Sequence, residues 1–269
     1  MIALNNILFI GTGNMASAIA GGIIKSKFVS PSQIYLFDKC QEQYKKFDSE
    51  CIGTSAIADG FSNAKYIFLS VKPQNIKDVL TEICQMDYKN KVFVSICAGI
   101  TIESIEASLP GAQIIRTMPN TPLMLGMGVT AICRNEKVSD TDFDFVIGIF
   151  SSSGYVTEIE EKDINCLTAV TSSSPAYVYL FAKGILEGAK AQGFNYDDTL
   201  KMICYTLIGS ANMILSTGKS VDDLIAMVKS PNGTTERALN VFEDKDFLNI
   251  ISEAMDACAK RADELSKLN

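Results

Sequence analysis

The residues best suited to chemistry form a glycine-rich stretch near the start of the sequence. An apolar run over residues 6–10 leads into Gly11-Thr12-Gly13-Asn14-Met15-Ala16, and an alanine-rich helical pattern follows. Gly11 allows a tight turn at the end of a buried strand, and Gly13 lacks the Cβ atom that would keep a pyrophosphate from the backbone. Ala16 lets the following helix lie close to the strand, with its N–H groups and positive end toward the phosphates. The stretch therefore predicts a nucleotide site, although the same glycines also fit a turn that binds nothing.

An acidic residue follows at the distance that a dinucleotide site requires. Residues 33–37 have the composition of a second strand, which ends at Asp38-Lys39. A carboxylate here accepts hydrogen bonds from the adenosine ribose and repels a 2′-phosphate, whereas an adjacent cation tolerates that phosphate. Asp38 and Lys39 therefore have opposite effects on cofactor preference, Asp38 favouring NADH and Lys39 tolerating NADPH. The alternative is that both belong to a solvated turn that contacts no nucleotide. From Asp38 we expect NADH to be used at least as well as NADPH.

Five further apolar runs predict a mostly parallel sheet that is buried on both faces. They cover residues 65–71, 91–96, 113–118, 129–133 and 155–159. We expect a helix from Asp140 to Phe150, and Thr101 is placed to cap an earlier helix. Lys72-Pro73 and Pro119-Asn120-Thr121-Pro122 follow strand ends, where the ligand crevice of such a sheet lies. Both are candidates for the cofactor site, although the second is equally well explained as a rigid turn.

The second half of the sequence is helical in its periodicity from Glu161 onward. We therefore predict an α/β Rossmann domain with a doubly wound, mostly parallel sheet at residues 1–160, followed by an all-α domain at residues 161–269. Residues 171–176 open or interrupt a long helix at a proline. Residues 230–236 form a turn that starts a helix, with Thr234 or Thr235 near its cap. A glycine-containing helix start with hydroxyl groups also suits a bound carboxylate.

Composition excludes several classes of function. The 24 basic and 31 acidic residues give a net charge of −7, so we expect no binding to nucleic acid or to an anionic membrane. No apolar run approaches the ~20 residues of a membrane span, and we expect a cytoplasmic protein. We interpret the eight scattered cysteines, Cys97 and Cys204 among them, as buried free thiols. The absence of histidine removes imidazole catalysis and histidine metal sites, and we expect no metal.

Six motifs together resemble one enzyme family over essentially the whole chain. In order they are Gly11-Thr12-Gly13-Asn14-Met15-Ala16, Ser70-Val71-Lys72-Pro73-Gln74, Cys97-Ala98-Gly99, Arg116-Thr117-Met118-Pro119-Asn120-Thr121-Pro122, Ser174-Pro175-Ala176-Tyr177 and Ser230-Pro231-Asn232-Gly233-Thr234-Thr235. Their order and spacing resemble those of pyrroline-5-carboxylate reductase. The resemblance implies reduction of Δ1-pyrroline-5-carboxylate to L-proline, the final step of proline biosynthesis, by NADPH or NADH. It also implies that the C-terminal helical domain binds substrate and interleaves with a partner's, in a homodimer or a dimer-based higher oligomer.

The resemblance further implies a role for particular residues. The cofactor would be held by Ile10, Gly11, Thr12, Gly13, Asn14, Met15, Ser70, Val71, Lys72, Pro73, Ala98 and Asn120, together with Asp38 and Lys39 at the ribose. The substrate would be surrounded by Glu161, Ser230, Gly233, Thr234 and Thr235. Backbone N–H groups of residues 233–235 would bind the substrate carboxylate. The Thr235 hydroxyl would lie at the ring nitrogen as the catalytic group.

This chemistry suits a chain without histidine, because a protonated cyclic imine is already an electrophile that mainly needs orientation. Reduction of a ketone would need a strong acid or cation, and related hydroxyacid dehydrogenases place a lysine at the position of Val178. The chain departs from the family's usual Gly-Ser-Gly at residues 172–174 and from Gly-Gly at residues 232–233. Two alternatives therefore stay open: a cyclic-imine or 2-hydroxyacid oxidoreductase of altered substrate, and a dinucleotide-binding regulator without turnover.

Overall fold

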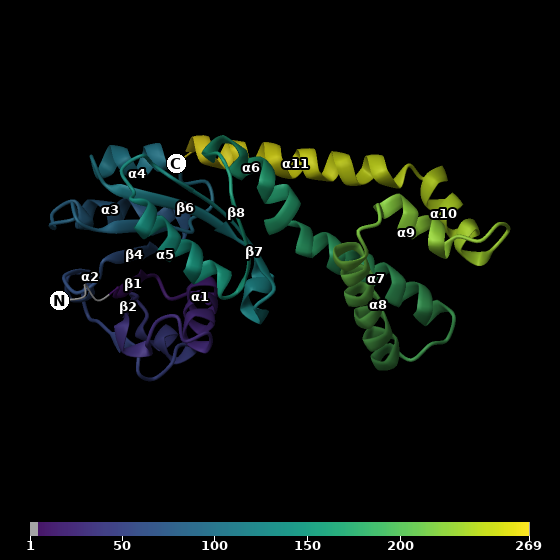
Figure 1. Cartoon of the computed structure of the whole chain (residues 1–269), viewed down its shortest axis with the longest axis horizontal. Helices are drawn as coiled ribbons and strands as arrows, with labels where there is room; N and C mark the ends of the chain where they lie inside the picture. The colour runs from purple at the N-terminus through teal and green to yellow at the C-terminus, as the bar shows by residue number, and fades with distance from the viewer. Residues whose placement is uncertain (1–4, 269) are drawn as a thin grey trace. The chain divides into compact units, whose positions relative to one another are not determined.

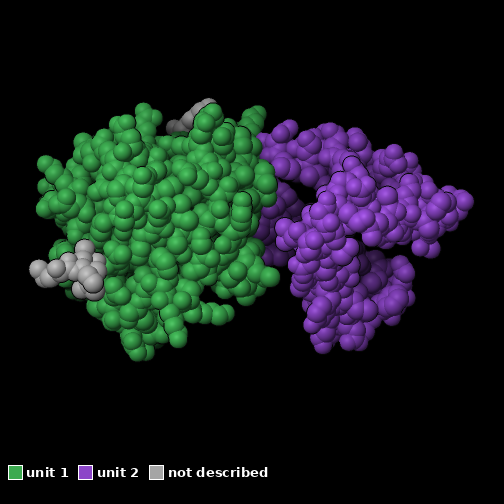
Figure 2. Space-filling model, in the orientation of Figure 1, with its two compact units in different colours: residues 1–173, 258–269 green, residues 174–257 purple. Residues whose placement is uncertain are grey.

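An eight-stranded sheet is the centre of the first of two units in the computed structural model, which describes residues 5–268. This unit, unit 1, contains the chain up to Ser173 and again from Cys258, whereas unit 2 contains Ser174–Ala257 (Figure 2). The strands are β1 (Ile7–Ile10), β2 (Ile34–Phe37), β3 (Ile52–Gly53), β4 (Tyr66–Leu69), β5 (Val92–Ser95), β6 (Gln113–Pro119), β7 (Gly128–Arg134) and β8 (Gly154–Glu158) (Figure 1). Their order is β3-β2-β1-β4-β5-β6-β7-β8, and only β6 and β7 pair antiparallel.

Helices cover both faces of this sheet. They are α1 (Asn14–Lys25), α2 (Ile57–Phe61), α3 (Ile76–Ile83), α4 (Ile102–Ser108), α5 (Asp140–Ser151), α6 (Ile164–Leu167) and the end of α11 (Phe247–Leu268). Helices α1 and α5 contribute Ile19, Ile23 and Phe150 to the apolar cluster on one face. Helices α2, α3 and α4 supply the cluster on the other face, with side chains such as Val79 and Ile105. All residues of β1, β4 and β5 are buried, because both faces are covered.

Short helical turns connect several of these elements. Five are 3-10 turns: η1 (Pro31–Gln33), η2 (Gln41–Lys46), η3 (Pro73–Asn75), η4 (Thr121–Leu125) and η5 (Glu161–Asp163). The sixth, η6 (Thr168–Ser172), is a π-helical turn directly before unit 2. Turns of the π type are often found at functional sites.

Unit 2 consists of helices and buries few of its apolar side chains within the single chain. Its helices are α7 (Ser174–Ala191), α8 (Tyr196–Thr217), α9 (Val221–Val228), α10 (Thr234–Asp244) and the start of α11 (Figure 1). Of residues 174–257, all of which the structure describes, Ile203 is the only hydrophobic side chain that is buried. Large exposed apolar side chains include Tyr179, Leu180, Met202, Ile208 and Leu215. An 84-residue unit cannot be stable on so small a core.

The predicted fold class is confirmed: a mostly parallel sheet in a Rossmann arrangement is followed by a helical region. The Thr101 hydroxyl caps α4 by accepting a hydrogen bond from the Ser104 N–H at 3.1 Å. The predicted domain boundary at residue 160 stays a prediction, since contacts divide the chain after Ser173 and return the end of α11 to unit 1. Within residues 5–268, no helix is both long and apolar enough to cross a membrane.

All eight cysteines carry free thiols. Cys97 and Cys133 are buried, and burial raises the pKa of each thiol to about 12. The prediction that the cysteines are buried is wrong for Cys40, Cys166 and Cys204, which are exposed in the single chain, and Cys51, Cys84 and Cys258 are only partly buried. Cys204 lies on α8. The physical reason is that the apolar side chains of α8 are largely uncovered. An apolar run in the sequence therefore marks a surface to be buried, without saying which chain buries it.

Candidate functional site

The backbone of the glycine-rich turn is fixed by the strands beside it. Gly11 follows β1 with φ of +92°, and its N–H donates to the Phe37 carbonyl at 2.8 Å. A Cβ atom at Gly11 would lie 2.6 Å from the Ser70 carbonyl oxygen, so both the dihedral angle and the neighbouring backbone require glycine. The Ser70 hydroxyl donates to the carbonyls of Ile10 at 3.0 Å and Gly11 at 2.7 Å. Ser70 thus holds the turn in place.

Gly13 has a different reason to be glycine. It is exposed, its φ is −70°, and a Cβ atom built on it would meet nothing within 4 Å among the described residues. Neither strain nor packing within the chain therefore requires a glycine. It is the N-cap of α1 and has no side chain with which to satisfy the first N–H groups of the helix. The residues present fit a dinucleotide, whose pyrophosphate would occupy this open helix start.

Asp38 is engaged by the glycine-rich turn itself. One carboxylate oxygen, Oδ2, accepts hydrogen bonds from the Thr12 N–H at 2.8 Å and the Thr12 hydroxyl at 3.0 Å. The other, Oδ1, accepts from the Cys40 N–H at 2.9 Å. Asp38 therefore ties the end of β2 to the turn after β1. These three donors occupy most of the acceptor positions of the carboxylate that the ribose hydroxyls would otherwise use.

Lys46 is a residue at this site that the sequence analysis missed. It is the last residue of η2, and its Nζ atom lies 2.9 Å from the Asn14 Oδ1 atom. Asn14 is the first residue of α1, directly after Gly13. A cation is thus held beside the predicted phosphate-binding turn by a contact between residues 32 positions apart. No local spacing in the sequence marks such a contact.

The remaining cofactor candidates lie at the carboxyl ends of β4, β5 and β6. Val71 follows β4, and its carbonyl accepts a weak hydrogen bond from the Cys97 thiol at 3.2 Å. Lys72 caps η3, which starts at Pro73, and Ala98 is exposed after β5. Because parallel strands end at one edge, these residues share that edge with the glycine-rich turn.

Asn120 links the turn after β6 to the π-helical turn η6. Its Oδ1 atom accepts from the Val129 N–H at 2.8 Å, and its Nδ2 atom donates to the Thr171 carbonyl at 3.0 Å. The side chain is 7% exposed. Asn120 therefore holds two backbone segments together at the predicted crevice.

Glu161 binds a buried arginine that the sequence analysis did not assign. Its Oε1 atom accepts from Arg116 Nη1 at 3.0 Å and from the Ile102 N–H at 2.7 Å. Arg116 is 2% exposed, and its Nη2 atom donates to Asn165 Oδ1 at 3.1 Å. Asn165 in turn donates to Asp263 of α11 at 3.0 Å. This network joins β6, η5, α6 and the end of α11 within unit 1, so Glu161 has a clear structural role there.

The turn before α10 carries the other substrate candidates, all in unit 2. Gly233 is the N-cap of α10, and its own N–H donates to the Ser230 carbonyl at 2.9 Å. Asn232 adopts a φ of +60°, which asparagine tolerates, and its N–H donates to Glu236 Oε2 at 2.7 Å. Thr234 and Thr235 are the first two residues of the helix, where backbone N–H groups have no partner within the helix.

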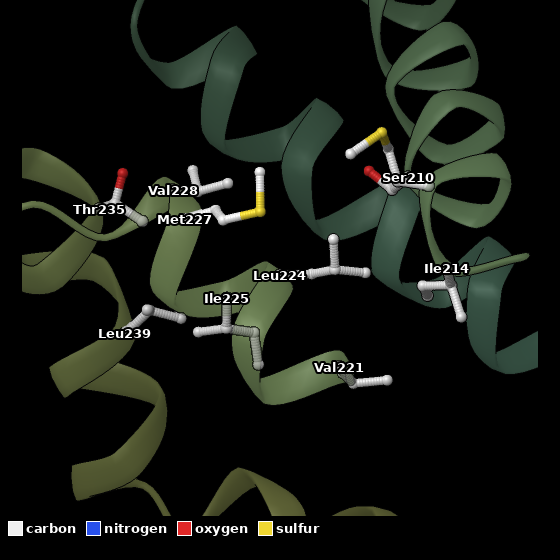
Figure 3. A pocket seen from close by; sticks show the side chains of 10 residues that line it. Ser210, Ile214, Val221, Leu224, Ile225, Met227, Val228, Thr235 and Leu239 are labelled. Atoms are coloured by element: carbon white, nitrogen blue, oxygen red, sulfur yellow. The ribbon is translucent and has the colours of Figure 1, made fainter. Parts of the chain in front are cut away.

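Thr235 also lines a cavity of about 350 Å³ between α8, α9 and α10 (Figure 3). The other lining side chains are mainly aliphatic, with Leu224, Ile225 and Val228 from α9 (Figure 3). The hydroxyl of Thr235 is thus a polar group beside an apolar wall. The sequence-predicted cofactor residues therefore gather in unit 1, and the substrate residues gather in unit 2 except for Glu161.

Comparisons with known proteins agree over the whole chain. The family model "Pyrroline-5-carboxylate reductase dimerisation" matches residues 161–265, and "NADP oxidoreductase coenzyme F420-dependent" matches residues 6–99. The pyrroline-5-carboxylate reductase of Escherichia coli K12 is 37% identical over 265 residues, which cover 96% of this chain and 97% of that relative. The structure resembles Plasmodium falciparum pyrroline carboxylate reductase with NADP bound, at a TM-score of 0.90 and 27% identity over 99% of this chain and 100% of that one. The Coxiella burnetii pyrroline-5-carboxylate reductase has a TM-score of 0.89 at 32% identity, over 98% and 99%.

Proposed function

The chain belongs to the pyrroline-5-carboxylate reductase family, and we propose that it reduces Δ1-pyrroline-5-carboxylate to L-proline with NADPH or NADH. The observation that carries this proposal is the match to a relative of that name along 96% of the chain. The open helix start at Gly13 supports the nucleotide-binding part of this proposal, since neither packing nor backbone strain within the described residues requires a glycine there. The predicted resemblance to this family is confirmed.

Unit 1 carries the residues proposed to bind the cofactor, which supplies a hydride to the substrate when it is bound. Gly13 and the first N–H groups of α1 would hold the pyrophosphate, because the helix start is open and has a positive end. Gly11 and Ser70 act through the backbone, by shaping and fixing the turn. Ile10, Met15, Val71, Lys72, Pro73, Ala98 and Asn120 complete the proposed set at the same sheet edge.

The substrate carboxylate is assigned to the N–H groups that start α10. The Gly233 N–H already donates to Ser230, and the Asn232 N–H already donates to Glu236. The N–H groups of Thr234 and Thr235 therefore form the proposed carboxylate site, and the helix dipole favours an anion there. The role proposed for Gly233 and Ser230 is to close the turn: a Cβ atom at Gly233 would lie 2.3 Å from the Ser230 hydroxyl oxygen.

The Thr235 hydroxyl is proposed to hold the imine nitrogen of the substrate. A protonated imine accepts hydride without further activation, so the demand on the protein is orientation, which supplies ~7–11 kcal/mol in favourable cases. A hydroxyl group meets this demand in a chain that has no histidine. Reduction of a 2-keto acid would instead need a strong proton donor or cation for the developing alkoxide, and the position of the corresponding lysine is Val178 here.

We also propose a homodimer or a dimer-based higher oligomer. The dimerisation model of the family covers residues 161–265, which include all of unit 2. The exposed apolar side chains of α7 and α8, among them Leu180 at 70% and Leu215 at 83%, need a cover that the single chain does not provide. Light scattering should find no stable 29.2 kDa species at micromolar concentration. A stable monomer under those conditions would refute this assembly.

The location proposed for the chain is the cytoplasm. All eight cysteines are free, as expected for a protein in a reducing compartment.

Turnover of purified protein tests the proposed function. Consumption of NADPH or NADH with Δ1-pyrroline-5-carboxylate, and formation of proline, are the expected results. The serines at residues 172–174 are the reason to test other substrates, because they replace the glycines usual in the family. Consumption only with other cyclic imines or with 2-keto acids would instead identify an oxidoreductase of altered substrate. Nucleotide binding without any turnover would identify a regulator.

A further inference from the structure

Lys46 is an unpaired cation at the start of α1. Its Nζ atom contacts Asn14 Oδ1 at 2.9 Å, and within residues 5–268 it forms no ion pair with a carboxylate. Its neighbour Lys45 differs in this respect, because Lys45 Nζ lies 2.5 Å from Glu42 Oε2. Of these two adjacent lysines, only Lys46 therefore presents an uncompensated charge to the glycine-rich turn.

The backbone on both sides of Lys46 is anchored. The Tyr44 hydroxyl donates to the Thr54 carbonyl at 2.9 Å and accepts from the Asp38 N–H at 3.1 Å. The Phe47 ring packs on Phe9 of β1, with the ring centroids 6.3 Å apart. Lys46 lies between these two anchors, so its chain segment is held beside β1 and β2. A cation held in this way loses little conformational entropy when it binds an anion.

The end of β2 is where a Rossmann domain meets the adenosine ribose, and two outcomes are common there. A free carboxylate binds the 2′-hydroxyl of NADH, whereas a nearby cation accommodates the 2′-phosphate of NADPH. In this chain the Asp38 carboxylate accepts three hydrogen bonds from Thr12 and Cys40, so little of it is free for the ribose hydroxyls. These hydrogen bonds leave the charge of Asp38 in place but use most of the acceptor capacity of its carboxylate, so the ribose hydroxyls of NADH gain less from it than the sequence indicated.

We propose that Lys46 binds the 2′-phosphate of NADPH and that the chain therefore prefers NADPH to NADH. This inference rests on the proposed function of the glycine-rich turn. The pyrophosphate is already supplied with donors by the open start of α1, and Lys46 is not needed for it. Lys46 belongs to the connection after β2, on the ribose side, and reaches Asn14 from there. The 2′-phosphate is the only charged group that distinguishes the two cofactors.

Equilibrium binding of both nucleotides to the full-length protein, measured by titration calorimetry, tests the proposal. The wild-type protein should bind NADPH at least tenfold more tightly than NADH. Lys46→Met, which keeps the length of the side chain and removes its charge, should weaken NADPH binding about tenfold, or 1.4 kcal/mol, and change NADH binding less than twofold. Lys46→Arg should keep most of the affinity for NADPH.

Two controls separate this role from a general effect of charge or folding. Lys45→Met removes the adjacent exposed lysine and should leave both dissociation constants within twofold of wild type. Adenosine 2′,5′-bisphosphate carries the 2′-phosphate without a nicotinamide, and it should bind the wild-type protein and lose about tenfold in Lys46→Met. Thermal unfolding without nucleotide should be nearly unchanged in both variants, because both lysines are exposed.

Three results would overturn the proposal. An equal loss for NADPH and NADH in Lys46→Met would assign Lys46 to the pyrophosphate. Unchanged NADPH binding in this variant would remove Lys46 from the site altogether, and a wild-type preference for NADH would refute the inferred specificity. The proposed enzymatic function fails separately: a protein that binds NADPH through Lys46 but does not reduce Δ1-pyrroline-5-carboxylate would leave the inference on Lys46 standing.

Discussion

Substitution of Gly13 by alanine should separate cofactor binding from folding. The added methyl group meets nothing within 4 Å among the described residues, and the φ of −70° is accessible to alanine. Alanine is a poorer N-cap than glycine by about 1 kcal/mol, and the loss of freedom in the unfolded chain offsets about 0.4–1 kcal/mol of this. The free energy of unfolding should therefore change by less than about 1 kcal/mol, or a few degrees in Tm.

The effect on binding should be larger, because the methyl group points into the space proposed for the pyrophosphate. Loss of one charge-assisted hydrogen bond between a backbone N–H and a phosphate oxygen is worth about 1.5–3 kcal/mol. The dissociation constants of NADPH and NADH should thus both rise ten- to hundredfold, since both cofactors contain the pyrophosphate. Equal losses for the two nucleotides distinguish this variant from Lys46→Met.

Gly11→Ala is the matched control for Gly13→Ala. Its Cβ atom would lie 2.6 Å from the Ser70 carbonyl oxygen, at a φ of +92°. Strain of this kind destabilises a protein by about 1–3 kcal/mol, so this variant should lose stability first. Thermal unfolding without nucleotide and calorimetric titration with NADPH measure the two effects. A Gly13→Ala protein that is folded and binds NADPH as tightly as wild type would refute the assignment of the open helix start to the cofactor.

Three further variants or treatments test the structure of unit 1. Glu161→Gln leaves the buried Arg116 without its carboxylate and should lower the free energy of unfolding, measured in urea titrations, by about 2–4 kcal/mol. Glu160→Gln is the control: its pair with Lys162 is exposed, so this variant should change the free energy of unfolding by less than about 0.5 kcal/mol. Burial would raise the pKa of Asp142, but hydrogen bonds from Lys65, Ser139 and Tyr66 outweigh it and lower that pKa below 3.8. The stabilisation by the Asp142 carboxylate is therefore present above about pH 4 and is lost as the pH falls through the lowered pKa. Asp142→Asn should be less stable than wild type at pH 7, and the difference in unfolding free energy should shrink at acid pH. A difference that stays constant with pH would contradict this. Iodoacetamide at pH 8 should modify the exposed Cys40 much faster than Cys97, whose pKa burial raises to about 12, and equal rates in the folded protein would contradict this order.

The sheet was predictable from the sequence because local composition determines it. Strands buried on both faces need continuous apolar runs, and the runs at residues 66–69 and 92–95 are of this kind. The two-residue strand β3 (Ile52–Gly53) was not predicted, since it is exposed and too short to show a pattern. The π-helical turn η6 also escaped prediction, and the carbonyl of its Thr171 accepts a hydrogen bond from the distant Asn120 side chain.

The site was predictable where a motif encodes backbone geometry, and less so where distant side chains meet. Gly11 and Gly13 were recognised by spacing, and the structure shows that only the first is required by the chain itself. Lys46 reaches Asn14 across 32 positions, and Arg116 reaches Glu161 across 45. Pairings of this kind depend on the tertiary fold, which brings together residues whose types are unremarkable in sequence. The sequence shows the charge of each residue, but it does not show which distant side chain that residue contacts.

Thr235 is where the sequence left two roles open, and the structure makes them separable. The N-cap of α10 is Gly233, and Thr235 is the second residue of the helix. A capping role would make Thr235→Ala less stable by ~0.5–2 kcal/mol, but at this position alanine is a better helix former and the unfolding free energy should hardly fall. If the hydroxyl holds the imine nitrogen, kcat/KM for Δ1-pyrroline-5-carboxylate should drop ten- to hundredfold, about 1.4–2.8 kcal/mol, while the affinity for NADPH stays unchanged.

Two replacements of Thr235 identify the atom responsible for that loss. Thr235→Ser keeps the oxygen and should recover much of the activity, whereas Thr235→Val keeps the shape beside the aliphatic wall of Leu239 and Val228 and should be as slow as alanine. If valine were active and serine were not, the methyl group would be the part that matters, through packing in the cavity. Unchanged kcat/KM in Thr235→Ala would remove the hydroxyl from the reaction and leave the backbone N–H groups of Thr234 and Thr235 as the substrate anchor at this turn.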